Sequence, residues 1–532
     1  MLSILDTGII IVYLISMIVM GYTLGKGNKT SNDYFLANRA MPWLPVGFSV
    51  AATMISANGF VGGPGWAYQD GIRPYMVNIG VPLAIFFVML TSMPIIYHLK
   101  ITSVYEYVEM RLGVKTRVLT VIGFLSNSII QISSMVFIPA LILRTFTGWR
   151  LEVIVPVIVL VAILYTLLGG IKAVIWTDLI QMLVLWGGLF IAMAIILNGL
   201  ELGFMETVQI GKEAGKLAAF DFSLKLSSAN TFWATLIGGT FMWLRYFGFD
   251  QGQVQRMLTS KSMKGLKRSF LFSAVMMNVM YFTFMILGVL LYVYFEGATF
   301  SNANEIMITF IQNNLPVGLI GLLIAGVFAA AMSSIDSLLN SMTTVFVKDI
   351  YERFFVKAER ETTLKFSMTI SLLWGICIIF VTLFSFSGTT RSVLDTVGSY
   401  ISYISGPMCG AFILAMATKR ANDEGVTLGV VIGFALTLYF GKTAGANWLW
   451  NPAVGAGSTM LIGYLASLVS KPKTESAATD QFTILGMREY LIRNNHSTED
   501  GVSCLPLHMD RYTWLVLMFF MAQYVVLAAL QY

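Results

Sequence analysis

The chain has 532 residues, of which 57% are hydrophobic and only 12% are charged. Soluble globular domains carry roughly 25% charged residues, so the composition excludes a soluble enzyme or binding module and indicates a membrane protein. The formal net charge of +6 is explained by basic loops that face anionic lipid on the cytoplasmic side. It therefore gives no reason to expect a nucleic-acid partner.

Apolar, charge-poor segments long enough to span a membrane, about 20 residues each, recur along the whole chain. None shows the alternation of a β-strand, so we predict an all-α polytopic membrane protein rather than a β-barrel. About fourteen spans are expected, at residues 4–24, 43–65, 75–97, 118–143, 152–169, 173–198, 231–250, 270–294, 316–347, 366–387, 395–417, 425–441, 446–470 and 513–531.

The distribution of basic residues predicts the orientation of these spans. If the first span begins outside, 25 of the 34 Lys and Arg residues fall in inward loops and eight in outward loops, with Arg245 inside a span. This bias follows the positive-inside rule. We therefore predict a multi-pass protein of the plasma (inner) membrane with both termini outside. The first apolar run lacks a basic n-region and is interpreted as the first span, not as a signal peptide.

The ninth predicted span, 316–347, carries an unusual set of polar residues. Ser333, Asp336, Ser337 and Asn340 follow i, i+3, i+4 and i+7 spacing and so share one helical face. Polar and ionisable side chains inside a span are costly and usually mark an ion or substrate pathway. Hard cations prefer oxygen ligands, so we predict a site for a small cation such as Na⁺. The alternative is that these side chains only form hydrogen bonds between packed helices.

Two spans have sequences that interrupt helices. The span at 43–65 ends in Gly-Gly-Pro-Gly, and the span at 231–250 contains Gly238, Gly239 and Gly248. Paired interrupted spans in matching places of two halves point to a transporter binding site. The pairs Gly62-Gly63 and Gly238-Gly239 are interpreted as bending points or as places of close helix packing.

The two interrupted spans lie five spans apart, so each would begin one half of an inverted five-plus-five repeat. The chain then forms a single membrane transporter domain over 1–532. Its parts are a peripheral first helix at 4–24, a first repeat at 43–198, a second repeat at 231–417 and three peripheral C-terminal helices at 425–531.

No motif for covalent chemistry is present. There is no P-loop, zinc spacing or nucleophile elbow, so we predict that the protein is not an enzyme. The segment DQFTILGMREYLIRN (480–494) is expected to form either a short amphipathic helix on the inner membrane face or a connecting loop.

Four local patterns resemble one known family. They are NDYFLANRAMPW (32–43), GGIKAVIWTDLIQ (169–181), GFDQGQVQRMLTSKS (248–262) and AAAMSSIDSLLNSMTTVFVKDIY (329–351). In this order and at these spacings they are similar to the sodium:solute symporters, which include transporters of glucose, proline, pantothenate, iodide and sialic acid. The resemblance covers nearly the whole chain and implies the inverted five-plus-five fold.

The resemblance also implies sodium ligands. The sodium site common to the family would use the backbone carbonyls of Ala52, Ile55 and Ala330 and the hydroxyls of Ser333 and Ser334. Members with a second sodium ion use an acidic residue at the position of Asp178 and hydroxyls near Ser333, Ser334, Asp336 and Ser337. Asp336 departs from the Ser or Thr of several members. Asp178 has the alternative role of a helix N-cap.

The implied solute pocket lies between the two interrupted helices. Its candidate residues are Ser56, Ala57, Asn58, Phe60, Asn78, Gln131, Ser133, Ser134, Trp243, Tyr246 and Asn278. Tyr246 matches an aromatic inner gate of sugar symporters, although ordinary helix packing is the alternative for both Trp243 and Tyr246.

The departures from the family bear on the solute. Galactose-binding relatives have Glu-Gln where this chain has Asn58-Gly59, and they have a further Glu near Asn78. Sialic-acid-binding relatives have an Arg near Ser133 or Ser134 that this chain lacks. Arg245 would supply a positive charge to the pocket or, as we favour, pair with Asp250.

The expected function is sodium-coupled symport of a small polar solute by alternating access, with one sodium ion or two. The neutral polar pocket favours a sugar, polyol or other polyhydroxyl compound. The alternative is an Na⁺ or H⁺ symporter for an amino acid or carboxylate, including sialic acid, proline, pantothenate and monocarboxylates. A transporter-fold sensor and a channel are less favoured, since no signalling domain and no filter sequence is seen.

Overall fold

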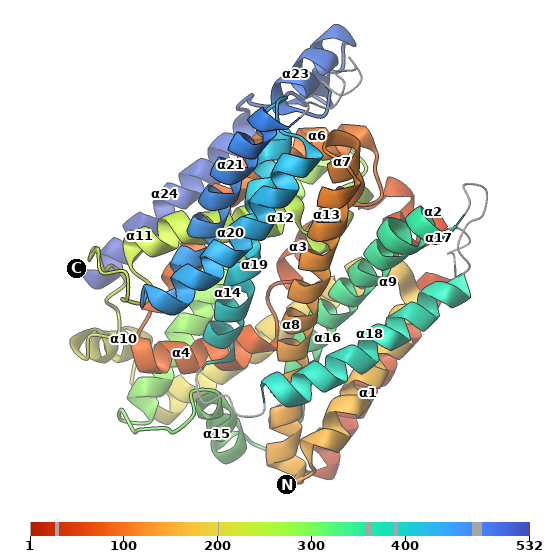
Figure 1. Ribbon diagram of the computed structural model, residues 1–532. Coiled ribbons are helices and arrows are strands. Elements are labelled where there is room, and N and C mark those ends of the chain that lie inside the picture. Colours follow the sequence, from red (N-terminus) through yellow and green to blue (C-terminus); the bar gives the residue numbers. More distant parts are fainter. Residues whose placement is uncertain (1, 27–30, 201, 357–363, 387–391, 471–480) are drawn as a thin grey trace.

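The computed structural model describes residues 2–26, 31–200, 202–356, 364–386, 392–470 and 481–532, and these are almost entirely helical (Figure 1). The long or span-forming helices are α1 (Ile4–Gly25), α3 (Trp43–Ala52), α4 (Gly63–Asp70), α5 (Met76–Leu90), α8 (Val114–Thr147), α9 (Leu151–Leu200), α12 (Thr240–Phe249), α14 (Met263–Tyr294), α16 (Leu319–Val345), α18 (Leu364–Ser385), α19 (Val393–Ala417), α20 (Asp423–Thr443), α21 (Asn451–Val469) and α24 (Arg511–Gln531).

Shorter elements connect them. The short α-helices are α2 (Ser31–Leu36), α6 (Ser92–Leu99), α7 (Val104–Arg111), α10 (Phe204–Glu213), α11 (Phe232–Ala234), α13 (Gln251–Thr259), α15 (Glu305–Asn314), α17 (Glu352–Phe355) and α23 (Ile484–Arg493). Three π-helical turns are η2 (Asn58–Gly62), η4 (Thr235–Gly239) and η5 (Phe346–Tyr351), and three 3₁₀ turns are η1 (Ala37–Arg39), η3 (Arg73–Tyr75) and η6 (Trp448–Trp450). The strands β1 (Thr498–Glu499) and β2 (Val502–Ser503) form a small antiparallel hairpin.

The all-helical polytopic prediction is confirmed. Each predicted span falls on helical chain, and eleven helices of the described residues are long and apolar enough to cross a membrane. The predicted spans outside those eleven are the two interrupted ones and the short segment at Leu151–Ile163. The segment DQFTILGMREYLIRN contains α23, so its helical interpretation holds.

The second predicted span is interrupted at the position that the family resemblance implies, whereas its Gly-Gly-Pro-Gly cluster at 62–65 is helical. Helix α3 ends at Ala52, residues 53–56 are not helical, and the chain becomes helical again through η2 and α4. In the seventh predicted span the interruption lies elsewhere: the chain is extended at Asp250 (ψ 128°), between α12 and α13. Gly238 and Gly239 lie in the π-helical η4 instead.

Close packing explains the glycine at position 238. A Cβ atom there would overlap the backbone carbonyl of Leu449, in η6. The close-packing interpretation therefore applies to this glycine, since no side chain fits in that space.

Helix α9 covers two predicted spans. It runs from Leu151 to Leu200 with one non-helical residue, Gly170 (φ 62°, ψ −174°), a conformation open to glycine. Asp178 lies eight residues beyond this kink, inside the continuing helix. The N-cap alternative for Asp178 is therefore wrong, because its backbone is already helical.

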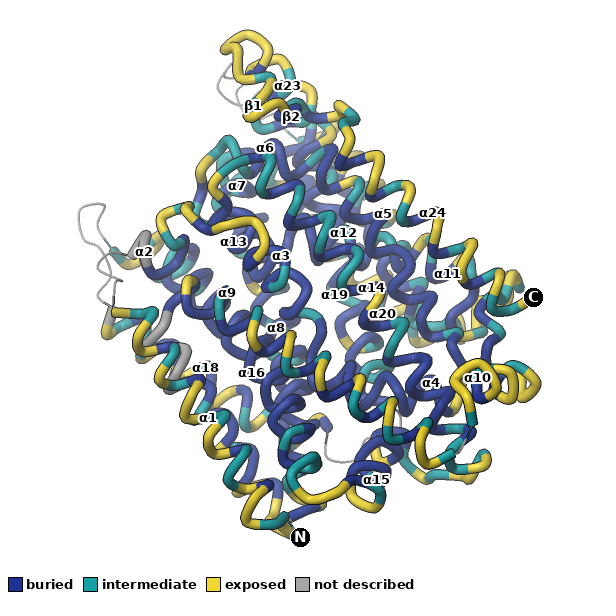
Figure 2. The backbone as a smooth tube through the Cα atoms, turned by 180° about the vertical axis from the view of Figure 1, so that it is seen from behind, coloured by how far each residue is buried: buried dark blue, intermediate teal, exposed yellow. Residues whose placement is uncertain are grey.

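Burial separates a core from a periphery (Figure 2). Every residue of α16 from Leu323 to Val345 is buried, whereas α1 buries only four residues and the edge helix α18 keeps several large apolar side chains exposed. The polar face of α16 is thus held inside the protein and not against lipid. This arrangement, with α3, α8 and α9 packed against α16, positions the candidate site.

Candidate functional site

Four of the five predicted ligands of the common sodium site converge at the interruption of α3. The Ala52 carbonyl lies 3.5 Å from the Ser333 hydroxyl and 3.3 Å from the Ser334 hydroxyl. The Ala330 carbonyl lies 3.1 Å and 3.3 Å from the same two hydroxyls. We call these four residues the sodium cluster. Ile55 lies in the same interruption of the chain.

The sodium cluster has the chemistry of a site for a monovalent cation. Its oxygens are neutral and its side chains are buried. Ligands about 2.4 Å from an ion and at right angles to one another lie about 3.4 Å apart, which matches the separations across this cluster. Among the described residues no group of three or more His, Cys, Asp or Glu side chains is placed to hold a metal ion.

The residues predicted for a second sodium ion adjoin this cluster on its next helical turn. Ser337 Oγ lies 3.2 Å from Asp336 Oδ1 and 2.5 Å from the Ser333 carbonyl. Asp178, on α9, accepts a short hydrogen bond from the Ser49 hydroxyl of α3. All of these side chains are almost fully buried. The structure therefore brings the predicted residues of both sites together.

A residue that the sequence analysis did not assign to the site lies among them. The Arg256 guanidinium of α13 is fully buried and contacts Asp178 Oδ2 at 3.5 Å, Ser49 Oγ at 2.7 Å and the Ser337 hydroxyl more closely. We call Ser49, Asp178, Arg256, Asp336 and Ser337 the carboxylate cluster. The sequence had placed Arg256 among the basic loop residues because it follows a span. The one signal was its place within the family-like pattern GFDQGQVQRMLTSKS.

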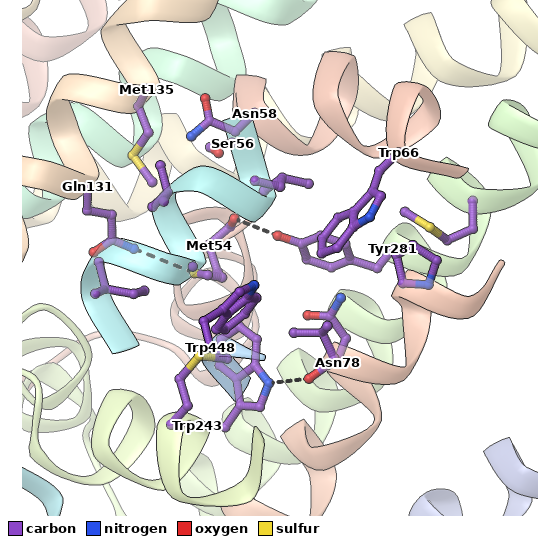
Figure 3. Close-up of a pocket in the computed structure, with 18 residues that line it drawn as sticks. Met54, Ser56, Asn58, Trp66, Asn78, Gln131, Met135, Trp243, Tyr281 and Trp448 are labelled. Atoms are coloured by element: carbon purple, nitrogen blue, oxygen red, sulfur yellow. Dashed lines mark hydrogen bonds between the residues drawn. The ribbon is translucent and has the colours of Figure 1, made fainter. Parts of the chain in front are cut away.

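A pocket lies beside the interruption of α3 (Figure 3). We call it the central pocket, and none of the described residues that line it is charged. Its lining residues are Met54, Ser56, Asn58, Trp66, Pro74, Val77, Asn78, Gln131, Met135, Met242, Trp243, Tyr281, Met285, Leu394, Val397, Gly398, Ile401 and Trp448.

Five of the eleven predicted solute residues line the central pocket, namely Ser56, Asn58, Asn78, Gln131 and Trp243. The other six, which are Ala57, Phe60, Ser133, Ser134, Tyr246 and Asn278, do not. Ser134 supports the pocket from behind, since its hydroxyl accepts a 2.8 Å hydrogen bond from Asn58. Phe60 packs edge-on against Phe284, and Asn278 is bonded to the Ala274 carbonyl of its own helix.

Sequence reasoning missed the aromatic residues that come from other parts of the chain. Trp66, Tyr281 and Trp448 line the pocket together with Trp243. All three indole N–H groups are already bonded, Trp66 to Asp70 (2.9 Å), Trp243 to the Val77 carbonyl (2.7 Å) and Trp448 to Asp395 (2.8 Å). The tryptophans therefore offer a solute only apolar ring faces. No local pattern marks them, because they belong to separate helices.

Two amide oxygens at the pocket have no hydrogen-bond partner among the described residues. Asn58 Oδ1 and Gln131 Oε1 are both buried and unsatisfied there, and the Gln131 amide nitrogen donates to the Met54 sulfur at 3.7 Å. A buried polar atom without a partner costs about 1–3 kcal/mol. These oxygens can accept hydrogen bonds from a bound solute.

Two further residues considered for the pocket, Tyr246 and Arg245, lie on α12 and contact side chains nearby. The Tyr246 hydroxyl accepts a 2.7 Å hydrogen bond from Gln253, and the Tyr246 ring packs against Trp243. Arg245 forms a buried ion pair with Asp250. This ion pair is the role that we favoured for Arg245 from the sequence. Arg245 is not among the residues that line the central pocket.

The fold and the site together define a sodium-coupled secondary transporter. The family model described as the sodium:solute symporter family matches residues 34–433. The chain belongs to the sodium:solute symporter family. It is a multi-pass protein of a plasma-membrane transporter family and is not an enzyme.

The names of several similar proteins state what they transport. The chain is 30% identical over 482 residues to the sodium/sialic acid symporter SiaT of Proteus mirabilis (strain HI4320), covering 88% of this chain and 96% of that protein. It is 29% identical to the human sodium/iodide cotransporter, covering 82% of this chain and 69% of that protein. It is also 29% identical to the human sodium-coupled monocarboxylate transporter 1, covering 78% and 69%.

Solved structures show the same fold. A substrate-bound, outward-open Na⁺-coupled sialic acid symporter superposes with a TM-score of 0.80 at 30% identity, over 89% of this chain and 99% of that one. Mhp1, a nucleobase-cation-symport-1 family transporter, matches with a TM-score of 0.59 at 13% identity, over 85% and 99%. The second likeness concerns the fold alone.

Proposed function

We propose that this protein imports a small organic carboxylate that carries a hydroxyl or amino group, together with Na⁺. The observation that carries the proposal is the helix start at the interruption of α3, beside a pocket whose described lining residues are all uncharged. The Ser56 carbonyl accepts the N–H groups of Gly59 (2.9 Å) and Phe60 (3.2 Å), which begins the new helix.

The first backbone N–H groups of this helix suit a carboxylate. Within the described residues, those of Ser56, Ala57 and Asn58 donate to no other group. A helix N-terminus carries roughly half a positive charge, and in transporters with broken helices such ends bind anionic solute groups while the preceding carbonyls bind Na⁺. Residues 52–58 supply both the carbonyls for Na⁺ and the N–H groups for a carboxylate within one interruption. This chain can therefore bind an acidic solute without the arginine that sialic-acid-binding relatives use.

The unsatisfied amide oxygens indicate what else the solute carries. Asn58 Oδ1 and Gln131 Oε1 accept hydrogen bonds, and a carboxylate alone has no donor for them. A hydroxyl or an amino group on the solute would satisfy them. Proline, lactate and sialic acid have such a donor, whereas butyrate has none.

A neutral sugar or polyol is the second candidate, since three tryptophan faces suit stacking on a sugar ring. It fits less well because a sugar needs many hydrogen-bond partners, and few lining side chains carry an amide or an aliphatic hydroxyl. These are Ser56, Asn58, Asn78 and Gln131, and most of the remaining lining is apolar. Asn78 lies apart from the other three in Figure 3. Each sugar hydroxyl buried without a partner would cost about 1–3 kcal/mol. The named relatives that transport sialic acid and monocarboxylates also favour an acid.

We further propose the inverted five-plus-five arrangement, with fourteen spans and both termini outside. The interrupted helices α3–η2–α4 and α11–η4–α12–α13 would begin the two repeats. The excess of Lys and Arg on one side places the start of α3 and the end of α16 in the cytoplasm. The pocket residues Trp66 and Pro74 follow the interruption of α3 and so lie on the outer side of the sodium cluster.

The sodium cluster of Ala52, Ala330, Ser333 and Ser334 would bind one Na⁺ ion together with the Ile55 carbonyl. The carboxylate cluster holds two buried carboxylates, Asp178 and Asp336, beside the hydroxyls of Ser49 and Ser337. Carboxylates inside a membrane usually serve an ion or proton pathway, so we propose that a second monovalent cation, Na⁺ or H⁺, binds beside Asp178 and Asp336.

Uptake into proteoliposomes with an inward Na⁺ gradient tests the proposed solute class. The panel contains labelled proline, lactate, sialic acid, pantothenate, butyrate, glucose and mannitol. We expect saturable, Na⁺-dependent uptake of one or more acids that carry a donor group, and weak uptake of butyrate. Gln131→Leu should lower the affinity for that acid without changing the sodium concentration at half-maximal uptake. Uptake of glucose or mannitol alone would contradict the carboxylate proposal and support the second candidate.

A further inference from the structure

Arg256 joins four helices at one point in the interior. Its Nε atom donates to Ser49 Oγ of α3 at 2.7 Å, and Nη1 donates to the Gly252 carbonyl of its own helix, α13. Nη2 donates to Ser337 Oγ of α16 and reaches Asp178 Oδ2 of α9 at 3.5 Å. The arginine side chain is fully buried. No other cationic side chain of the described residues forms an ion pair with Asp178.

The guanidinium lies on one particular side of the sodium cluster. Ser49 precedes Ala52 by three residues on α3, and Ser337 follows Ser333 by four residues on α16. At 1.5 Å per residue these offsets are about 5–6 Å along each helix. In the proposed orientation α3 runs outward and α16 runs inward, so both offsets point to the cytoplasm. Arg256 therefore lies one helical turn below the sodium cluster.

We propose that Arg256 is a latch that closes the sodium site toward the cytoplasm. Its charge repels a cation that leaves the site in that direction, and its hydrogen bonds hold α3 and α13 against α9 and α16. Sodium release then requires the guanidinium to leave Asp178 and Ser337. The inference rests on sodium coupling and on the proposed orientation, and it does not depend on which solute is carried.

The latch explains a requirement of coupled transport. If Na⁺ could reach the cytoplasm whenever it occupied its site, the gradient would dissipate without moving solute. Arg256 contacts the helix that contains the interruption, α3, at Ser49. A rearrangement that moves α3 and α13 away from α9 and α16 therefore breaks the contacts with both Asp178 and Ser337 together.

The test is ²²Na⁺ flux into proteoliposomes in the absence of any solute. We expect low flux for the unaltered protein and at least a tenfold increase for Arg256→Gln, which removes the charge. Arg256→Lys should leak less than Arg256→Gln, because it keeps the charge but loses the planar fork of donors. Arg353→Gln is the matched control, since this arginine pairs with Glu109 outside the cluster and its loss should leave the flux unchanged.

Two further measurements separate a latch from a structural role. Adding Ser334→Ala to Arg256→Gln should abolish the extra flux, because the leak would pass through the sodium cluster, whereas a leak through damaged protein would persist. Ser49→Ala and Ser337→Ala each remove one acceptor while keeping the charge on Arg256, and each should raise the flux even if Arg256→Gln fails to fold.

The outcomes are decisive. Unchanged flux in folded Arg256→Gln, or in both serine variants, would overturn the proposal, as would an extra flux that survives Ser334→Ala. Tryptophan fluorescence of the unaltered protein, titrated with Na⁺ alone, tests sodium binding separately. Failure to bind Na⁺ would refute the sodium site itself, while failure of the solute panel would leave the latch untouched.

Discussion

Replacing Ser334 with alanine tests the sodium cluster directly. The substitution removes one hydroxyl that lies 3.3 Å from both the Ala52 and the Ala330 carbonyls. Because α16 is buried here, no lipid headgroup reaches the position of that oxygen. The cation would lose one ligand, and the remaining ligands lie on a rigid helix and at the end of another.

The structure sets the size of the expected effect. A hydrogen bond to a charged group is worth about 1.5–3 kcal/mol, and we take one ion–hydroxyl contact as comparable. Since about 1.4 kcal/mol is a factor of ten, the sodium concentration at half-saturation should rise roughly 10- to 150-fold. The fold itself should lose little stability, because alanine has the highest helix propensity and, within the described residues, this hydroxyl bonds only to backbone carbonyls.

The assay is a titration of purified protein with Na⁺, followed by the fluorescence of the tryptophans at the central pocket. Ser341→Ala is the matched control: it lies on the same helix two turns away, and its hydroxyl bonds the Ser337 carbonyl at 2.9 Å. It should leave sodium affinity within about twofold. Equal sodium affinity in Ser334→Ala and the unaltered protein, or equal losses in both variants, would refute this assignment of the ligands.

Two other predictions concern stability. Gly238→Ala should abolish folded protein in a size-exclusion assay, because the new methyl group would overlap the Leu449 carbonyl. The control Gly457→Ala has open space around the new methyl group and should fold at least as well as the unaltered protein. A normal yield of folded Gly238→Ala would contradict the close approach of Gly238 to Leu449. Lys267→Met should lower the free energy of unfolding by about 2–3 kcal/mol, measured by thermal denaturation in detergent. The buried Lys267 ammonium bonds Asp510 at 2.7 Å. The loss of unfolding free energy should be smaller than the roughly 3–5 kcal/mol of a broken buried ion pair, because Asp510 keeps its hydrogen bonds from two backbone N–H groups of α24. An unchanged melting temperature would show that the ion pair contributes nothing to stability.

Local sequence determined the helices and one face of the sodium cluster. A membrane span is a continuous apolar segment, so its existence follows from composition along the chain and needs no partner. The i, i+3, i+4 and i+7 spacing around Ser333 likewise lies within one helix. The interruption after Ala52 was placed by the family resemblance, because the Gly-Gly-Pro-Gly cluster of that span is helical. The interruption at Asp250 was not visible, since the pair Gly238-Gly239 pointed to a place about twelve residues earlier, where Gly238 packs against Leu449.

Only the tertiary structure decided what faces these residues. Arg256 reads as a loop charge in the sequence, yet α13 folds back into the core and carries its guanidinium to Asp178, 78 positions earlier in the chain. Trp66 and Trp448 meet at one pocket although about 380 residues separate them. Such contacts depend on how helices pack, and the periodicity of a single helix contains no information about its neighbours. The sequence by itself therefore determined the class of protein and the helix proposed to bind sodium, while packing decided which groups surround the central pocket and the sodium cluster.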